Sequence, residues 1–100
     1  MWRQGDVFIH AVKEIPKTAK LVRRDSGRVV LAYGEVTGHA HAIHEPEALL
    51  FDNEGALYLQ ADGTVTLRHE EHAPVPLGPG SYRVVKQREY APEAIRNVVD

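Results

Sequence analysis

The sequence contains no cysteine. This absence excludes disulfides and thiolate ligands, so any bound metal must be held by nitrogen and oxygen atoms. The sequence also has no apolar run near the ~20 residues that a membrane-spanning helix needs, and no signal-peptide pattern opens it. We therefore expect a cytoplasmic protein that has no membrane partner.

An excess of basic residues is missing as well. The formal net charge is −2, whereas a protein that wraps nucleic acid needs surplus Lys and Arg to neutralise phosphates. This balance predicts that nucleic acid is not a partner. With 100 residues, 43% of them hydrophobic and 26% charged, the composition is that of one ordinary globular domain spanning residues 1–100.

Short β-rich runs separated by turn residues fill most of the sequence. Gly, Asn, Asp and Pro punctuate the chain at close intervals, as expected where tight turns join antiparallel strands. The pattern predicts an all-β fold, a small β-barrel or sandwich. The expected strands cover residues 6–12, 20–24, 28–36, 48–51, 56–60, 64–69 and 81–90.

Only the C-terminal segment, Pro92 to Val99, has a helical pattern. Proline suits the first turn of a helix, and Ala94, Ile95, Val98 and Val99 then fall on roughly one side. We expect a short helix there.

Five of the six histidines lie in two short clusters. His39, His41 and His44 belong to a segment that we expect to continue directly from the strand at 28–36. His69 and His72 enclose Glu70 and Glu71 in the second cluster. Neutral imidazole is the commonest protein ligand for borderline divalent metals, and neighbouring carboxylates can complete the coordination. The two clusters therefore predict a divalent metal site for Zn, Fe, Mn or Ni.

The spacing within each cluster indicates which side chains share a face. His39 and His41 lie on one face of an extended strand, and His44 falls on the other unless a turn before Pro46 brings it or Glu45 back. In the second cluster, strict alternation places His69 with the apolar residues. Alternation alone does not choose between His69 and His72. We take His72 as the third ligand and His69 as the next candidate.

The run Gly34-x4-His39-x-His41-x3-Glu45 resembles the first motif of the cupin superfamily. The resemblance implies a metal site inside a β-barrel, with His39, His41 and Glu45 as ligands and His72 or His69 as the last imidazole. The spacer before His39 is one residue shorter than in that motif, and the match covers about a dozen residues. The segment Gly34 to His41 is also similar to short uncharacterised bacterial and phage proteins, which implies no function.

Three functions are compatible with these features. The first is a cupin-like metalloprotein with a small-molecule ligand, in which Glu70 or Glu71 acts as a general base if turnover occurs. The second is a homo-oligomer assembled through strand edges and histidine clusters. The third is a pH-responsive module that uses clustered imidazoles. We favour the first and leave open whether the protein is an enzyme.

Overall fold

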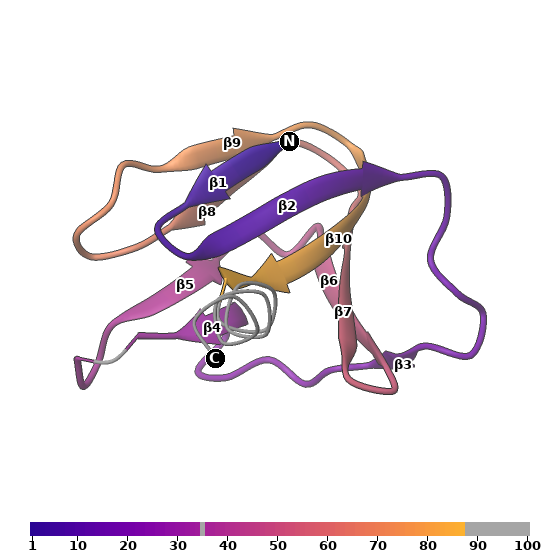
Figure 1. Ribbon diagram of the computed structural model, residues 1–100, viewed down its shortest axis with the longest axis horizontal. Helices are drawn as coiled ribbons and strands as arrows, with labels where there is room; N and C mark the ends of the chain where they lie inside the picture. The colour runs from indigo at the N-terminus through magenta and orange to yellow at the C-terminus, as the bar shows by residue number, and fades with distance from the viewer. Residues whose placement is uncertain (35, 88–100) are drawn as a thin grey trace, which may run out of the picture.

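Ten β-strands in two antiparallel sheets form the part of the chain that the computed structural model describes, residues 1–34 and 36–87 (Figure 1). The six-stranded sheet has the order β1-β2-β10-β7-β6-β3, and the four-stranded sheet has the order β4-β5-β8-β9. The strands are β1 (Trp2–Gln4), β2 (Val7–Val12), β3 (Lys20–Leu21), β4 (Val29–Tyr33), β5 (Ala40–Ile43), β6 (Ala48–Asn53), β7 (Ala56–Ala61), β8 (Val65–Arg68), β9 (Val75–Leu77) and β10 (Gly80–Lys86).

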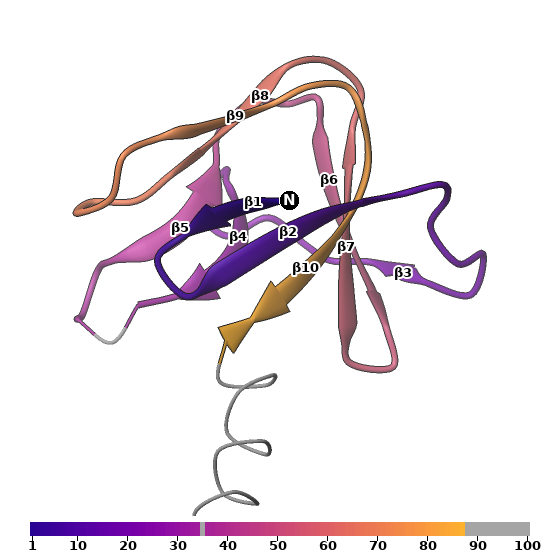
Figure 2. The same ribbon diagram turned by 45° about the horizontal axis from the view of Figure 1, so that its top comes forward.

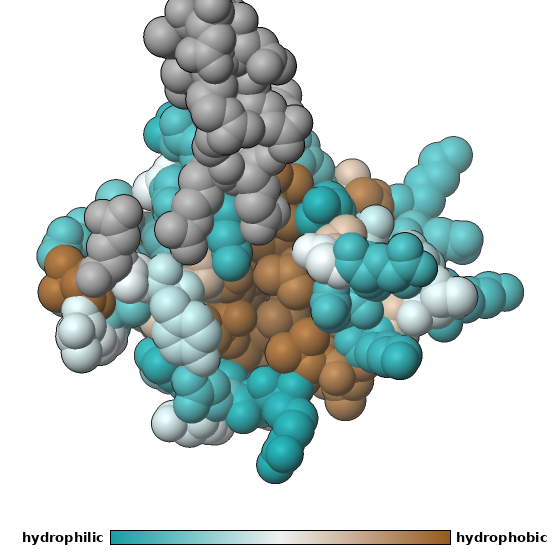
Figure 3. Space-filling view, turned by 60° about the horizontal axis from the view of Figure 1, so that its bottom comes forward, coloured by the Kyte–Doolittle hydropathy of each residue, from teal (hydrophilic) through white to brown (hydrophobic). Residues whose placement is uncertain are grey.

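The prediction of an all-β fold is confirmed, and its form is an unclosed sandwich. Figure 2 shows the two sheets facing one another, and the strand pairings between described residues stay within each sheet. On the face seen in Figure 3, apolar side chains gather in the middle between hydrophilic margins. The helix expected at Pro92 to Val99 lies outside the described residues. Nowhere in residues 1–34 and 36–87 does a helix have the length and apolarity needed to cross a bilayer.

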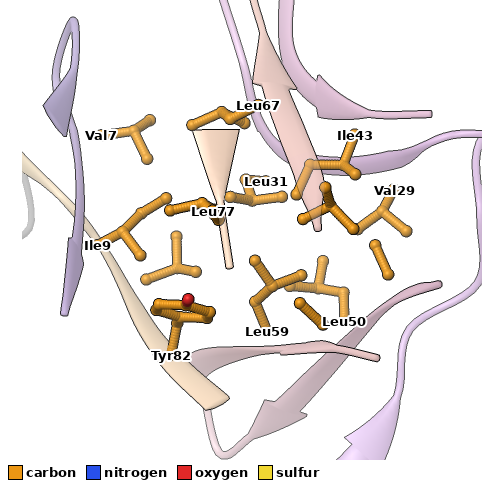
Figure 4. Packing of buried hydrophobic residues seen from close by; sticks show 14 of the residues in the cluster. Val7, Ile9, Val29, Leu31, Ile43, Leu50, Leu59, Leu67, Leu77 and Tyr82 are labelled. Carbon is orange, nitrogen blue, oxygen red and sulfur yellow. The ribbon is translucent and has the colours of Figure 1, made fainter. Parts of the chain in front are cut away.

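Alternating side chains from both sheets fill the core between them (Figure 4). In β8, Val65 and Leu67 are buried while Arg68 is exposed, and β2 buries Val7 and Ile9 in the same way. This period of two is what a strand with one covered face requires. The apolar alternation in the sequence thus fixes which face of each strand points inward.

The histidine-rich segment is a separate strand, not the continuation of the preceding one. β4 and β5 pair antiparallel around a turn in which Gly34 N–H donates to His39 O at 2.8 Å. A Cβ atom on Gly34 would lie only 3.0 Å from the His39 Cβ, and Gly38 has a φ of +89°. Both glycines permit a tight reversal that other residues would strain. The reversal sends β5 back into the sheet beside β8.

Candidate metal centre

The register between β5 and β8 brings the two histidine clusters together. Ala42 pairs with Arg68, and Ile43 pairs with Leu67. One residue further along this antiparallel register, His41 lies across from His69, and their ring centroids are 4.3 Å apart. Two motifs separated by about thirty residues therefore meet because their strands are neighbours.

His41 points to the inside of the sandwich. It shares the face of β5 that carries Ile43, and only 3% of His41 is exposed. His39, two residues earlier on the same face, has a half-buried side chain. The histidine cluster therefore lies at the margin of the apolar core: His41 is buried, and the other imidazoles are closer to solvent.

Both histidines of the second cluster lie close to His41. The ring centroid of His72 lies 4.7 Å from that of His69 and 5.9 Å from that of His41. His69 is half-buried, in keeping with its place on the inward face of the β8 register, whereas His72 is exposed in the segment before β9. Alternation did not choose between His69 and His72 as a ligand. The structure does not exclude either one, because both rings lie close to His41.

The tightest set of potential ligands consists of His39, His69 and Glu70, whose ligand atoms all lie within 4.8 Å of one another. Glu70 Oε1 accepts a hydrogen bond from Ala40 N–H at 2.9 Å, and this bond lowers the pKa of the Glu70 carboxyl below its usual value. The carboxylate is thus ionised and held against β5, with its second oxygen still available. Glu70 offers a ready oxygen ligand.

Gln4, which the sequence did not single out, holds His41 from the opposite sheet. It is 2% exposed, and its amide donates to Leu67 O at 2.9 Å and to Ala73 O at 3.0 Å. Because both amide hydrogens are used, the atom that faces His41 Nδ1 at 2.8 Å is the acceptor Oε1. His41 Nδ1 must therefore carry a proton, and the neutral ring keeps its lone pair on Nε2.

The lone pair on Nε2 of His41 faces a carboxylate. His41 Nε2 lies 3.5 Å from Asp6 Oδ1, and Asp6 belongs to the two-residue turn between β1 and β2. Burial, followed by the neighbouring His69, lowers the pKa of His41 to about 4, so the ring is neutral at pH 7. The other residue of the turn, Gly5, has a φ of +59°. A Gly-Asp pair is a recognisable hairpin signal, but nothing in the sequence connects this turn with the histidines.

Glu71 contacts two histidines in different ways. Its Oε2 lies 3.3 Å from His39 Nδ1, so a proton on that nitrogen leaves Nε2 of His39 free to bind a metal. Its backbone N–H donates to His69 Nδ1 at 3.0 Å, which places the proton of the neutral His69 ring on Nε2. A metal ion would therefore have to displace either that hydrogen bond or that proton to bind His69.

The structure places His44 and Glu45 apart from this cluster. His44 is exposed and follows the end of β5, on the face opposite that of His41. Glu45 Oε1 accepts a hydrogen bond from Thr66 N–H at 3.3 Å, three residues before His69 on β8. The glutamate that the cupin resemblance implies as a ligand thus has a different contact, and Glu70 is the carboxylate that lies beside the histidines.

Comparison with known proteins identifies a family for this chain. Searches of the curated proteins and of the solved structures find no match, so the cupin resemblance gains no support from them. One family model matches residues 3–87, and its description is a domain of unknown function, DUF8820. Because the match extends over most of the sequence and includes both histidine clusters, the chain belongs to the DUF8820 family.

Proposed function

We propose that this domain binds a divalent metal ion through His39, His69 and Glu70. The observation that carries the proposal is the distance of at most 4.8 Å between the ligand atoms of these three residues, which come from two neighbouring segments. A nitrogen and oxygen ligand set of this kind suits Zn, Fe, Mn or Ni. His41 and His72 extend the imidazole cluster around the ion.

The surrounding contacts support this assignment. Glu71 beside His39 Nδ1 acts as the carboxylate that orients a metal-binding imidazole, and the Ala40 N–H holds Glu70 in place. The partial exposure of His39 and His69 gives an ion access from solvent. Three protein ligands leave a coordination position for water or a small molecule, which is the arrangement that metal-assisted catalysis uses.

Catalysis is the further step of this proposal. If a small-molecule substrate occupies the open position, Glu71 is the carboxylate best placed to move a proton, because Glu70 serves as a ligand. The expected compartment remains the cytoplasm.

Assembly through strand edges is the second candidate function. Leu21 on β3 and Tyr33 on β4 are 60% and 61% exposed, and each strand forms the edge of its sheet. Unpaired edges that carry apolar side chains favour pairing with a second copy. Light scattering tests this candidate: a monomer at all concentrations would remove it, and an oligomer that Leu21→Asp dissociates would support it.

The metal proposal is tested by titrating protein purified without an affinity tag with Zn²⁺, Ni²⁺, Mn²⁺ and Fe²⁺. We expect binding to at least one ion, and a loss of affinity of 10-fold or more in His39→Ala and Glu70→Gln. The matched controls are His44→Ala and Glu47→Gln, two exposed side chains outside the cluster. No binding by the wild-type protein, or equal losses in the controls, would refute the proposal.

A further inference from the structure

The β1–β2 turn places one further potential metal ligand, Asp6, against His41 of the cluster. Asp6 Oδ1 lies 3.5 Å from His41 Nε2. Two ligand atoms that bind one tetrahedral ion at ~2.0–2.1 Å are separated by roughly 3.3–3.4 Å. The observed separation is therefore close to that of two atoms sharing a cation.

The contact has the wrong polarity for a hydrogen bond in a neutral histidine. Gln4 forces the proton of His41 onto Nδ1, so Nε2 and the Asp6 carboxylate are two acceptors that face each other. Two facing acceptors repel unless a positive charge lies between them. The buried Gln4 side chain makes three hydrogen bonds, to Leu67 O, Ala73 O and His41 Nδ1. The proton of the His41 ring therefore cannot move from Nδ1 to Nε2 without breaking this network.

We propose that His41 Nε2 and Asp6 hold a second divalent cation, with His72 as the imidazole that completes the site. This inference rests on the proposed function, because it adds an ion beside the one at His39, His69 and Glu70. The two ligand sets share no residue. Gln4 is the positioning residue that aims His41, in the way that second partners orient metal-binding histidines.

The geometry around Gly5 places His72 at this second site. A Cβ on Gly5 would lie 2.8 Å from His72 Nε2 and 3.2 Å from His41 Cε1, so both rings reach the same side of the turn. His72 is exposed and its ring is stacked on His41 at an angle of 22°. Because His72 is exposed, its side chain can turn toward the ion without displacing buried residues. Two nitrogens and one oxygen again suit a borderline divalent ion.

The number of Zn²⁺ ions bound per chain tests this inference, measured by native mass spectrometry and calorimetry on the full chain. We expect two ions in the wild-type protein, one in Asp6→Asn and one in His39→Ala. Asp62→Asn, an exposed aspartate in the β7–β8 turn, is the matched control and should bind two. His72→Ala should lower the affinity for the second ion by 10-fold or more. Because His72 is exposed, we expect this substitution to leave folding unchanged.

The outcomes separate the two proposals. If the wild-type protein binds one Zn²⁺ and Asp6→Asn changes only the affinity for that ion, the second site is overturned and the first remains. A protein that binds none would overturn both. An Asp6→Asn variant that still binds two ions would also reject the second site. Nitrogen NMR of the His41 ring gives an independent readout, since Zn²⁺ at Nε2 shifts that resonance in the wild-type protein and leaves it unshifted in Asp6→Asn.

Discussion

The histidine cluster has two sides that are held in different ways. On the anchored side, made of Gln4, Asp6 and His41, a buried amide from one sheet fixes an imidazole of the other. On the exposed side, made of His39, His69, Glu70 and Glu71, the contacts come from neighbouring segments at the surface of the same sheet.

The difference is visible in the two imidazoles that lie across from each other. Gln4 Oε1 accepts a hydrogen bond from Nδ1–H of His41 and so leaves the lone pair on Nε2, whereas Glu71 N–H donates to Nδ1 of His69 and so leaves the proton on Nε2. A buried network makes such an arrangement costly to change, but a hydrogen bond in an exposed turn is easily exchanged with water. Preorganisation is therefore a property of the anchored side, and adaptability is a property of the exposed side.

Removing the amide of Gln4 should break the anchored side and have the largest effect. Gln4→Leu leaves Leu67 O, Ala73 O and His41 Nδ1 without their partner, and one unsatisfied buried group costs about 1–3 kcal/mol. We expect the free energy of unfolding to fall by about 2–4 kcal/mol, measured by urea denaturation of metal-free protein. Gln87→Leu, at an exposed site, is the control. A loss no larger than that of the control would mean that the amide contributes little.

Acid should weaken the anchored side of the metal-free protein. The folded pKa of His41 is about 4, while an unfolded histidine titrates near ~6.5, so the unfolded chain takes up the proton first as the pH falls. The contribution to stability is complete above pH ~6.5 and is lost progressively down to pH ~4. We expect a decrease on the order of 2 kcal/mol across this window.

Urea denaturation between pH 7.5 and 4.5 measures this dependence in the presence of a chelator. His41→Gln should flatten the pH profile even though it lowers stability overall, because the titrating group is gone. His44→Ala, which removes an exposed histidine, should retain the slope of the wild-type protein. Parallel profiles for wild-type protein and His41→Gln would contradict the assignment.

A methyl group on Gly5 should have the smallest of these effects and show how closely the turn packs against the cluster. Gly5→Ala introduces a left-handed alanine, which costs about 1–2 kcal/mol, and a Cβ only 2.8 Å from His72 Nε2. Gly27→Ala is the matched control, since Gly27 has a φ of +81° with open space around it. Denaturation should show a larger loss for Gly5→Ala, and adding His72→Ala should remove the excess. Equal losses at both glycines would show that the contact with His72 has no energetic consequence.

Much of the fold could be read from local pattern, but the pairing of strands could not. The alternation of Val65 and Leu67 gives the inward face of β8, and Gly-containing turns mark several hairpins. The reversal at Gly34 and Gly38 is not evident from the sequence, because the β-rich residues on both sides of it resemble one strand. The short strands β1 and β9 are hidden for a related reason: three residues carry too little periodicity to be recognised.

Composition and alternation already show which kinds of ligand this protein offers and that His39, His41 and His69 share the inward-facing positions in and beside β5 and β8. The folded arrangement alone reveals that β5 lies beside β8 and that Gln4 and Asp6 approach His41 from the opposite sheet. Alternation is a property of neighbouring residues and needs no partner to be seen. The register between distant strands follows from packing the whole core, so the polar groups that contact His41 are known only once the two sheets are in place.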